Sequence, residues 1–244
     1  MIPWVHLDTA TVPGSKSELR LMQRGTEFAI MAGATPLMNS RMSSSEIVLA
    51  EVACERLKGR RKIRMLIGGY GMGFTLRAAL AGLNGDASVL VAELVPAVLK
   101  WARGPMAELT AGGLSDPRVT VHENDVGAVI AASRGSLDAI LLDVDNGPDG
   151  LSREGNDSLY SWRGLQAAKQ ALRPGGMLAV WSAAPSKAFV NRLEQVGFAV
   201  EEVKARANKG RGVRHIIWVA TRPAEMAKPK STSGPNRSGF RPKT

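Results

Sequence analysis

The sequence is poor in cysteine, histidine and aromatic residues, and it contains no long apolar run. Cys54 is its single cysteine, so an internal disulfide is excluded. Its three histidines are scattered without the spacing of zinc ligands, so we expect no histidine-based metal site. No stretch approaches the roughly 18 consecutive apolar residues of a membrane-spanning helix, and no charged segment leads an apolar one at the N-terminus. These absences predict a cytoplasmic protein with no membrane partner.

The thiol of Cys54 fits the inner face of a helix. Four residues recur at the three- and four-residue spacing of one helical face: Ile47, Ala50, Cys54 and Leu57. The helix is expected to run to about Lys58, and Ser43 and Glu46 at its start have the spacing of a capping box. We therefore predict a buried core thiol rather than a nucleophile.

Positive charge is in excess, with 32 lysines and arginines, 22 acidic residues and a formal net charge of +10. Residues 223–244 are polar, basic and rich in proline and serine, and we expect a disordered tail there. Positive charge attracts nucleic acid, but only 5% of the residues are aromatic and the basic residues are dispersed. A nucleic-acid-binding protein without catalysis remains an alternative, although nucleic acid is not the partner that we expect.

A glycine-rich turn is the feature around which the chain is organised. Residues 64–67 predict an apolar strand that ends in four glycines: Gly68, Gly69, Gly71 and Gly73. Glycine permits positive φ and the close approach of a ligand, and the N-terminus of the helix that follows favours negative charge. The dinucleotide fingerprint needs glycine or alanine where Phe74 stands, which disfavours NAD.

An acidic residue ends the next expected strand, residues 88–92. Glu93 stands twenty residues after Gly73, where a carboxylate can accept hydrogen bonds from both hydroxyls of a ribose. The glycines alone are also compatible with a tight turn that binds nothing. Together with Glu93 they predict an adenosine-bearing ligand.

Strand-like and helix-like segments alternate from residue 64 onward. The expected strands are 64–67, 88–92, 118–122, 137–142 and 177–182, and the expected helices are 73–82, 96–110, 125–132, 160–172 and 186–195. Such alternation predicts a parallel sheet with right-handed crossovers, and residues 198–204 and 213–220 fit a closing antiparallel hairpin. We therefore predict an α/β fold with a Rossmann-like, seven-stranded sheet of the class I methyltransferase type.

A small β appendage is expected before the main sheet, with strands at 17–24, 27–31 and 35–38. The expected division is an N-terminal β-hairpin region (1–42), a Rossmann-like cofactor-binding catalytic domain (43–222) and the basic tail (223–244).

Ligands of open α/β sheets bind at the carboxyl ends of the strands. After the third strand, Asn124 or Asp125 can bind an adenine amine, and Asp125 also fits the N-cap of the next helix. The loop after the fourth strand begins with Asp143 and Asp145, and a carboxylate there can orient an attacking amine or take its proton. We expect Asp143 first and Asp145 second as the catalytic group, with a magnesium site in this loop as a minor alternative. Tyr160 either walls a substrate pocket or packs its helix onto the sheet.

From residue 18 to about 222 the chain resembles the spermidine synthase (polyamine aminopropyltransferase) family of the adenosylmethionine-dependent transferase superfold. The matching segments are 66–73, Ala92-Glu93-Leu94, Asn124-Asp125, 142–148 and 172–176. The resemblance implies that Glu93 binds the ribose, that Asp125 binds the adenine amine, and that Asp143 deprotonates the amine substrate.

The resemblance also implies a role in polyamine biosynthesis. An aminopropyl or related alkyl group would pass from decarboxylated S-adenosylmethionine, or from S-adenosylmethionine, to a small-molecule amine without a metal. The expected cofactor-binding residues are Gly68, Gly69, Gly71, Gly73, Glu93, Leu94, Asn124, Asp125 and Asp143. Family members pair, so a homodimer is expected.

Three places depart from the pattern of the family. Gly71 replaces an aspartate that holds the amine of the aminopropyl arm, residues 43–46 replace an acidic and aromatic-histidine signature, and Asn146 replaces a second acid. Without that aspartate, repulsion against the carboxylate of intact S-adenosylmethionine is relieved. An S-adenosylmethionine-dependent methyltransferase acting on a small molecule is therefore the alternative enzyme.

Overall fold

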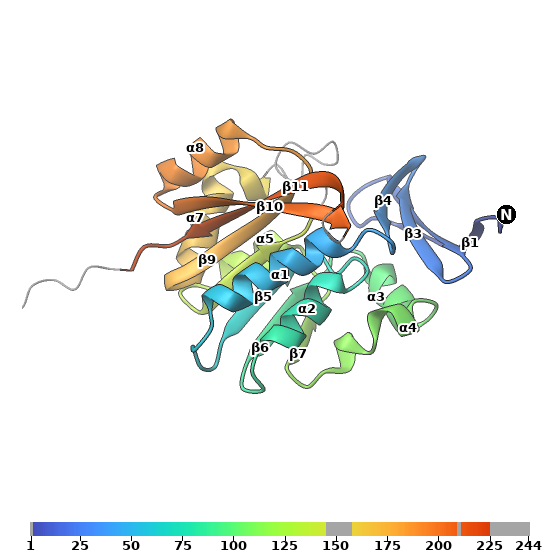
Figure 1. Cartoon of the computed structure of the whole chain (residues 1–244), viewed down its shortest axis with the longest axis horizontal. Coiled ribbons are helices and arrows are strands. Elements are labelled where there is room, and N and C mark those ends of the chain that lie inside the picture. The colour runs from blue at the N-terminus through green and yellow to red at the C-terminus, as the bar shows by residue number, and fades with distance from the viewer. Residues whose placement is uncertain (1, 145–157, 209–210, 225–244) are drawn as a thin grey trace, which may run out of the picture.

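A computed structural model of the chain describes residues 2–144, 158–208 and 211–224 and contains two separate sheets (Figure 1). The smaller sheet is antiparallel and has the strand order β1-β2-β3-β4. Its strands are β1 (Val5–Thr11), β2 (Glu18–Arg24), β3 (Glu27–Ala32) and β4 (Thr35–Asn39). This sheet confirms the expected β appendage and adds β1, for which no separate strand was predicted. The division of the chain at residues 42 and 222 stays a prediction.

The larger sheet has seven strands in the order β10-β11-β9-β8-β5-β6-β7. Its strands are β5 (Arg64–Gly68), β6 (Ser88–Ala92), β7 (Val119–His122), β8 (Leu137–Leu142), β9 (Leu172–Ser182), β10 (Ala199–Asn208) and β11 (Arg211–Thr221). The first five are parallel, while β11 runs antiparallel to both β9 and β10. The predicted Rossmann-like sheet with its closing hairpin is therefore confirmed.

Helices cover both faces of this sheet (Figure 1). One layer contains α1 (Ser44–Arg56), α2 (Phe74–Gly82) and α3 (Pro96–Arg103), and the other contains α5 (Val126–Ala132), α7 (Trp162–Ala171) and α8 (Lys187–Val196). The expected helix 96–110 is interrupted, because α3 ends at Arg103 and a short helix α4 (Ala107–Thr110) follows. Pro105 in the gap has no backbone N–H to continue the helix. No helix in the described part of the chain is long and apolar enough to cross a bilayer.

The strands supply alternate residues to the two helical layers. In β5, Met65 and Ile67 belong to the cluster beneath α1 and α2, whereas Leu66 belongs to the cluster beneath α5, α7 and α8. Each is at most 1% exposed. Because a central parallel strand is covered on both faces, its sequence is continuously apolar until the glycines begin.

The start of α1 differs from the predicted capping box. Ser43 makes no side-chain hydrogen bond to the helix backbone, because its φ of −113° and ψ of −5° are helical rather than extended. Glu46 does not reach back to the cap either, and its carboxylate accepts a hydrogen bond from Ser45 Oγ at 3.0 Å. The capping-box prediction was wrong, and the Glu46 side chain is available for another role.

The inner face of α1 is rotated relative to the prediction. Its buried residues are Ser45, Leu49, Ala50 and Ala53. Cys54 is only half-buried, and its sulfur approaches α2 so closely that a Cβ on Gly82 would lie 2.9 Å from it. Burial raises the pKa of Cys54 to about 11, so the thiol stays protonated at neutral pH. Cys54 is therefore less buried than its helical spacing predicts.

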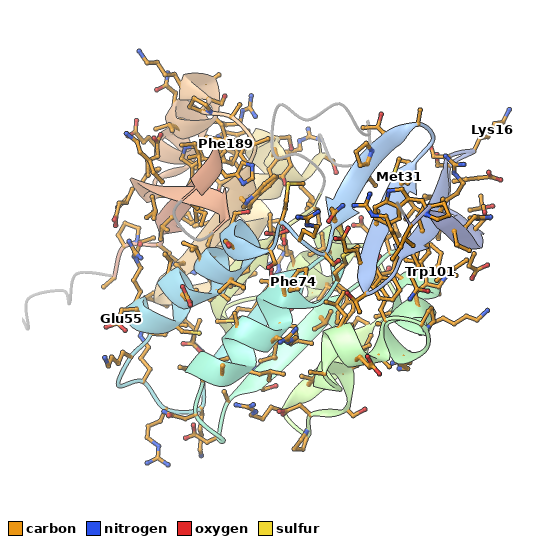
Figure 2. The ribbon with its side chains drawn as sticks, turned by 45° about the vertical axis from the view of Figure 1, so that its right-hand side comes forward. Lys16, Met31, Glu55, Phe74, Trp101 and Phe189 are labelled. Carbon is orange, nitrogen blue, oxygen red and sulfur yellow. The ribbon has the colours of Figure 1, made fainter. Side chains whose placement is uncertain are left out.

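The small sheet packs against α3. Trp101 of α3 is 1% exposed, and its indole Nε1 donates a hydrogen bond to Asp8 Oδ2 of β1 at 2.7 Å. Figure 2 shows Trp101 beside this sheet, on which Met31 is labelled, and Phe74 at the start of α2 nearer the centre of the molecule. The appendage therefore lies over the side of the main sheet at which the parallel strands end.

Candidate active site

Three neighbouring strands bring the predicted site residues to one edge of the main sheet. β5 lies between β8 and β6, so Gly68, Ala92 and Leu142 end side by side. The strand order also reverses at β5, because the chain moves outward through β6 and β7 and then returns to pair β8 with β5. Ligands of open α/β sheets bind at such a switch point.

The turn after β5 has the backbone conformation that its glycines predict. Gly69, Gly71 and Gly73 have φ values of +82°, +54° and +76°. A Cβ on Gly69 would lie 2.7 Å from the Asp143 carbonyl oxygen, so that position needs glycine for space as well as for conformation. A Cβ on Gly71 would lie 2.8 Å from the sulfur of Met38. The glycine turn is thus enclosed by the end of β8 and by β4.

Glu93 is buried beneath this turn and holds it in place. Its Oε2 accepts the backbone N–H of Tyr70 at 2.9 Å, and its Oε1 accepts the N–H of Val95 at 2.8 Å. Burial raises the pKa of the Glu93 carboxyl, and the backbone donors oppose that shift. The backbone N–H groups of Gly71 and Leu94 also lower this pKa, so four backbone donors surround the Glu93 carboxylate.

A cavity of about 130 Å³, here called the glycine cleft, collects most of the predicted ligand-binding residues. Its lining includes Gly69, Gly71, Glu93, Leu94, Asn124, Asp125 and Asp143. The opposite wall comes from the small sheet through Leu37 and Met38. Glu93 and Asp143 therefore face the same cavity, as the sequence predicts. Gly68 and Gly73 shape the turn without lining this cavity.

Asp125 has the N-cap role that its position predicts. Its Oδ1 accepts the backbone N–H of Ala128 at 3.1 Å, and Asn124 Oδ1 accepts the N–H of Asp125 at 2.8 Å. Both side chains remain at the cavity wall, so capping is compatible with contact to a ligand.

Asp143 lies where the glycine cleft meets a second cavity of about 80 Å³, here called the acid pocket. The acid pocket is lined by Leu37, Met38, Asn39, Glu46, Tyr70, Gly71, Met72, Phe74, Thr75, Asp143 and Trp181. The Thr75 hydroxyl, on α2, donates to Asp143 Oδ2 at 3.0 Å. Burial raises the pKa of Asp143 to about 6, although the Thr75 hydrogen bond opposes that shift. Such a group can take a proton near neutral pH.

Glu46 is the site residue that the sequence analysis missed. It comes from the first turn of α1 and lines the acid pocket beside Asp143. Burial, and then the negative charge of Asp143, raise the pKa of Glu46 to about 7. A signal was present, because Ala50 and Ala53, four and seven residues later on the same helical face, are buried. The spacing of Ser43 and Glu46 predicted a capping box instead, which gave Glu46 a different role.

Tyr160, another predicted catalytic residue, lies outside these cavities. Tyr160 is 2% exposed, packs edge-on against Phe189 and has its hydroxyl 3.4 Å from the Val144 carbonyl oxygen. It does not line either cavity. Asp145 and the rest of the segment 145–157 lie outside the described residues, as does Asn146. The catalytic roles of Tyr160 and Asp145 stay predictions.

A larger cavity, about 860 Å³, is a groove between α1 and α2. It is lined by residues such as Ile47, Glu51, Cys54 and Ala78, and none of the predicted ligand-binding residues lines it. We favour the smaller cavities as the site because glycines with positive φ and carboxylates converge there. Within the described ranges, no group of three histidine, cysteine or acidic side chains is arranged to hold a metal ion.

The profile of the spermine/spermidine synthase domain family matches residues 44–203 of this chain. A polyamine aminopropyltransferase from Mycobacterium tuberculosis is 29% identical over 155 residues, which cover 58% of this chain and 28% of that protein. The chain thus spans less than a third of the length of this curated relative.

Solved structures share the fold. A spermidine synthase from Thermotoga maritima superposes with a TM-score of 0.72 at 15% identity, covering 90% of this chain and 74% of that one. A spermidine synthase in complex with the transition-state analogue AdoDATO gives a TM-score of 0.71 at 15% identity, with 90% and 73% covered. At this identity the likeness concerns the fold alone.

Proposed function

The chain belongs to the spermine/spermidine synthase domain family, and from that membership we propose that it is an aminopropyltransferase acting on a small-molecule amine. The observation that carries the proposal is the position of Asp143. Its side chain lines both the glycine cleft, which also contains Glu93, and the acid pocket. A group at this junction can contact a donor on one side and an acceptor on the other.

The glycine cleft has the chemistry to hold an adenosyl sulfonium. Glu93 is proposed to accept both ribose hydroxyls, Asp125 or Asn124 to bind the adenine amine, and the glycine turn to approach the sulfonium arm. At about 130 Å³ the cleft is narrower than typical ligand pockets of about 300–1,000 Å³. Leu37 and Met38 of the small sheet narrow the cleft, and we propose that they move outward when the ligand enters.

The donor supplies a carbon made electrophilic by the adjacent positive sulfur. Asp143 orients the acceptor amine and takes its proton, which leaves the nitrogen lone pair free to attack. The C–N bond forms, the C–S bond breaks, and its electron pair returns to the sulfur. The resulting thioether is a neutral leaving group, so this site needs no acid on the donor side.

The second candidate is methyl transfer from intact S-adenosylmethionine. Gly71 favours it, because no carboxylate at that position is available to bind the amine of an aminopropyl arm. The space beside Gly71 holds the Met38 thioether instead. Decarboxylated S-adenosylmethionine is the proposed donor because the relatives named above are aminopropyltransferases and spermidine synthases.

The test uses the full chain, each donor in turn, and a set of primary amines that includes putrescine, with products identified by mass spectrometry. We expect aminopropylated amine and methylthioadenosine from the decarboxylated donor. The variant Asp143→Asn should lower kcat by about 10²- to 10⁴-fold while methylthioadenosine binds as before. Methylated amine from the intact donor, with no aminopropyl product, would replace the first candidate by the second.

We also propose that two copies of the chain pair, as the family resemblance implies. Light scattering measures the molecular mass of the protein as it elutes from a size-exclusion column, and this mass tests the proposal. A mass of one chain at all concentrations would refute the dimer and leave the catalytic proposal intact.

A further inference from the structure

Building on the proposed transferase function, we propose that Glu46 is a second acidic residue of the acceptor site and binds the acceptor ammonium together with Asp143. Nothing in the motifs of the chain marks Glu46 for this role. It follows from the way in which three separate elements converge on the acid pocket.

The position of the Glu46 carboxylate is fixed by its neighbours. Ser45 is 1% exposed, and its hydroxyl donates to Glu46 Oε2 at 3.0 Å. Thr75 Oγ1 lies 3.4 Å from the Glu46 backbone carbonyl and donates to Asp143 Oδ2 at 3.0 Å. Thr75 therefore lies between the first turn of α1 and the end of β8, and Glu46 and Asp143 line one pocket.

Among the residues that the structure describes, none with a positive charge lines the acid pocket. Neither Glu46 nor Asp143 forms an ion pair with any residue that the structure describes. The neighbouring side chains are largely apolar or aromatic, including Leu37, Phe74 and Trp181. In such surroundings two carboxylates repel strongly, and an ammonium between them relieves the repulsion. The pocket is therefore built for a cation.

Two acids also fit the charge balance of the reaction. An amine arrives as an ammonium ion at neutral pH, and Asp143 takes one proton from it. As the C–N bond forms and the C–S bond breaks, the positive charge moves from sulfur to the acceptor nitrogen. An ionised Glu46 beside that nitrogen stabilises the charge as it develops.

The experiment compares wild type, Glu46→Gln, Glu46→Asp and Glu51→Gln, whose folding is verified by circular dichroism. Glu51 is an exposed acid on the same helix and serves as the matched control. For Glu46→Gln we expect the KM for the amine to rise at least about tenfold, while the KM for the donor changes less than about twofold. Glu46→Asp, which keeps the charge, should lie between this variant and wild type.

The pH profile separates binding from a merely structural role. In wild type the acid limb of kcat/KM for the amine should contain the ionisation of Glu46, whose pKa is about 7, as well as that of Asp143, whose pKa is about 6. Glu46→Gln lacks the first ionisation, so its acid limb should lie at lower pH. If Glu46→Gln keeps the wild-type KM for the amine and the wild-type acid limb, the role of Glu46 is refuted and the proposed function stands.

Wild type without activity on any amine would instead count against the proposed function. Titration of putrescine into the full chain saturated with methylthioadenosine then decides the role of Glu46. Weaker binding by at least about tenfold in Glu46→Gln, but not in Glu51→Gln, supports the role. Equal binding in wild type and Glu46→Gln, or no binding in wild type, overturns it.

Discussion

At the scale of single residues, Asp143 and Glu46 show how a fold can raise the pKa of two carboxyls at once. Each loses water contact on burial, and Glu46 also faces the charge of Asp143. The Thr75 hydroxyl opposes the rise in the Asp143 pKa, because it donates a hydrogen bond to that carboxylate. The balance leaves both groups titrating near neutral pH, where proton transfer to and from an amine is useful.

The raised pKa of Glu46 should make stability depend on pH. The folded state holds a proton on Glu46 more tightly than the unfolded chain, whose carboxyl has a pKa near 4.5, against about 7 in the fold. Between these values the folded state binds more protons, so stability falls as pH rises through the window. Glu46→Gln carries no charge and should be more stable than wild type at pH 8 by about 1–3 kcal/mol. Near pH 4 the gain should vanish.

Thermal unfolding at the two pH values measures this effect. For a chain of this length the gain at pH 8 corresponds to a rise in Tm of about 3–10 °C. Glu51→Gln should show no difference that depends on pH. A Tm difference of the same size at pH 4 and pH 8 would rule out burial of a charged Glu46 as the cause.

At the scale of elements, the turn after β5 depends on the strand beside it. Glu93, at the end of β6, accepts N–H groups from the glycine turn and from the start of α3. One buried carboxylate therefore joins two strand-to-helix connections. A tight turn alone does not need such a group, which supports a ligand-binding role for this edge.

We predict that Glu93→Gln weakens methylthioadenosine binding by about 10- to 100-fold, because an amide NH₂ replaces one accepting oxygen and removes the charge from the ribose contacts. Calorimetry measures the affinity. Glu123→Gln is the control, since Glu123 is an exposed acid at the end of β7 that does not line the glycine cleft. Equal affinities in wild type and Glu93→Gln would contradict the proposed ribose contact.

At the scale of the whole molecule, stability and function use opposite ends of β8. Asp138, near the start of the strand, accepts the Arg64 backbone N–H at 2.9 Å and an Arg173 guanidinium N–H at 2.7 Å. Its side chain is 7% exposed, and Arg60 lies 3.7 Å away. Five residues of strand, roughly 16 Å, separate it from Asp143.

Asp138→Ala should destabilise the fold without affecting ligand binding. It removes a buried acceptor from Arg64 and a counter-ion from two half-exposed arginines, at a cost of about 2–3 kcal/mol. We expect Tm to fall by about 4–10 °C and the affinity for methylthioadenosine at 20 °C to stay within about twofold. Asp86→Asn breaks the exposed pair with Arg61 and should leave Tm unchanged. Lost ligand affinity in folded Asp138→Ala would show that the two ends of β8 are coupled.

The small sheet supplies one wall of the candidate site. Leu37 and Met38 of β4 line both cavities, while Trp101 and Asp8 fasten the sheet to α3. The main sheet alone would leave the carboxyl ends of β5, β6 and β8 open to water. With the appendage in place, the carboxylates lie in apolar surroundings where their interactions with a ligand are stronger.

The sequence by itself determined the alternation of strands and helices, the glycine turn, and the acids that follow β6 and β8. These are local features, because periodicity, positive φ and the first residue after a strand depend on near neighbours. From strand alternation and the ligand rule for open sheets it also predicted that Glu93 and Asp143 meet, and the order β8-β5-β6 brings them to one cavity.

Only the tertiary structure decided the second acid and the walls of the site. Glu46 has the local spacing of a cap, and its inward position depends on how α1 is rotated against α2 and the sheet. Met38 lies against Gly71, and Trp181 and Glu46 line the same acid pocket, so segments far apart in the chain meet at the site. Side-chain packing across such separations fixes which polar groups share a cavity, and no short-range pattern encodes that choice.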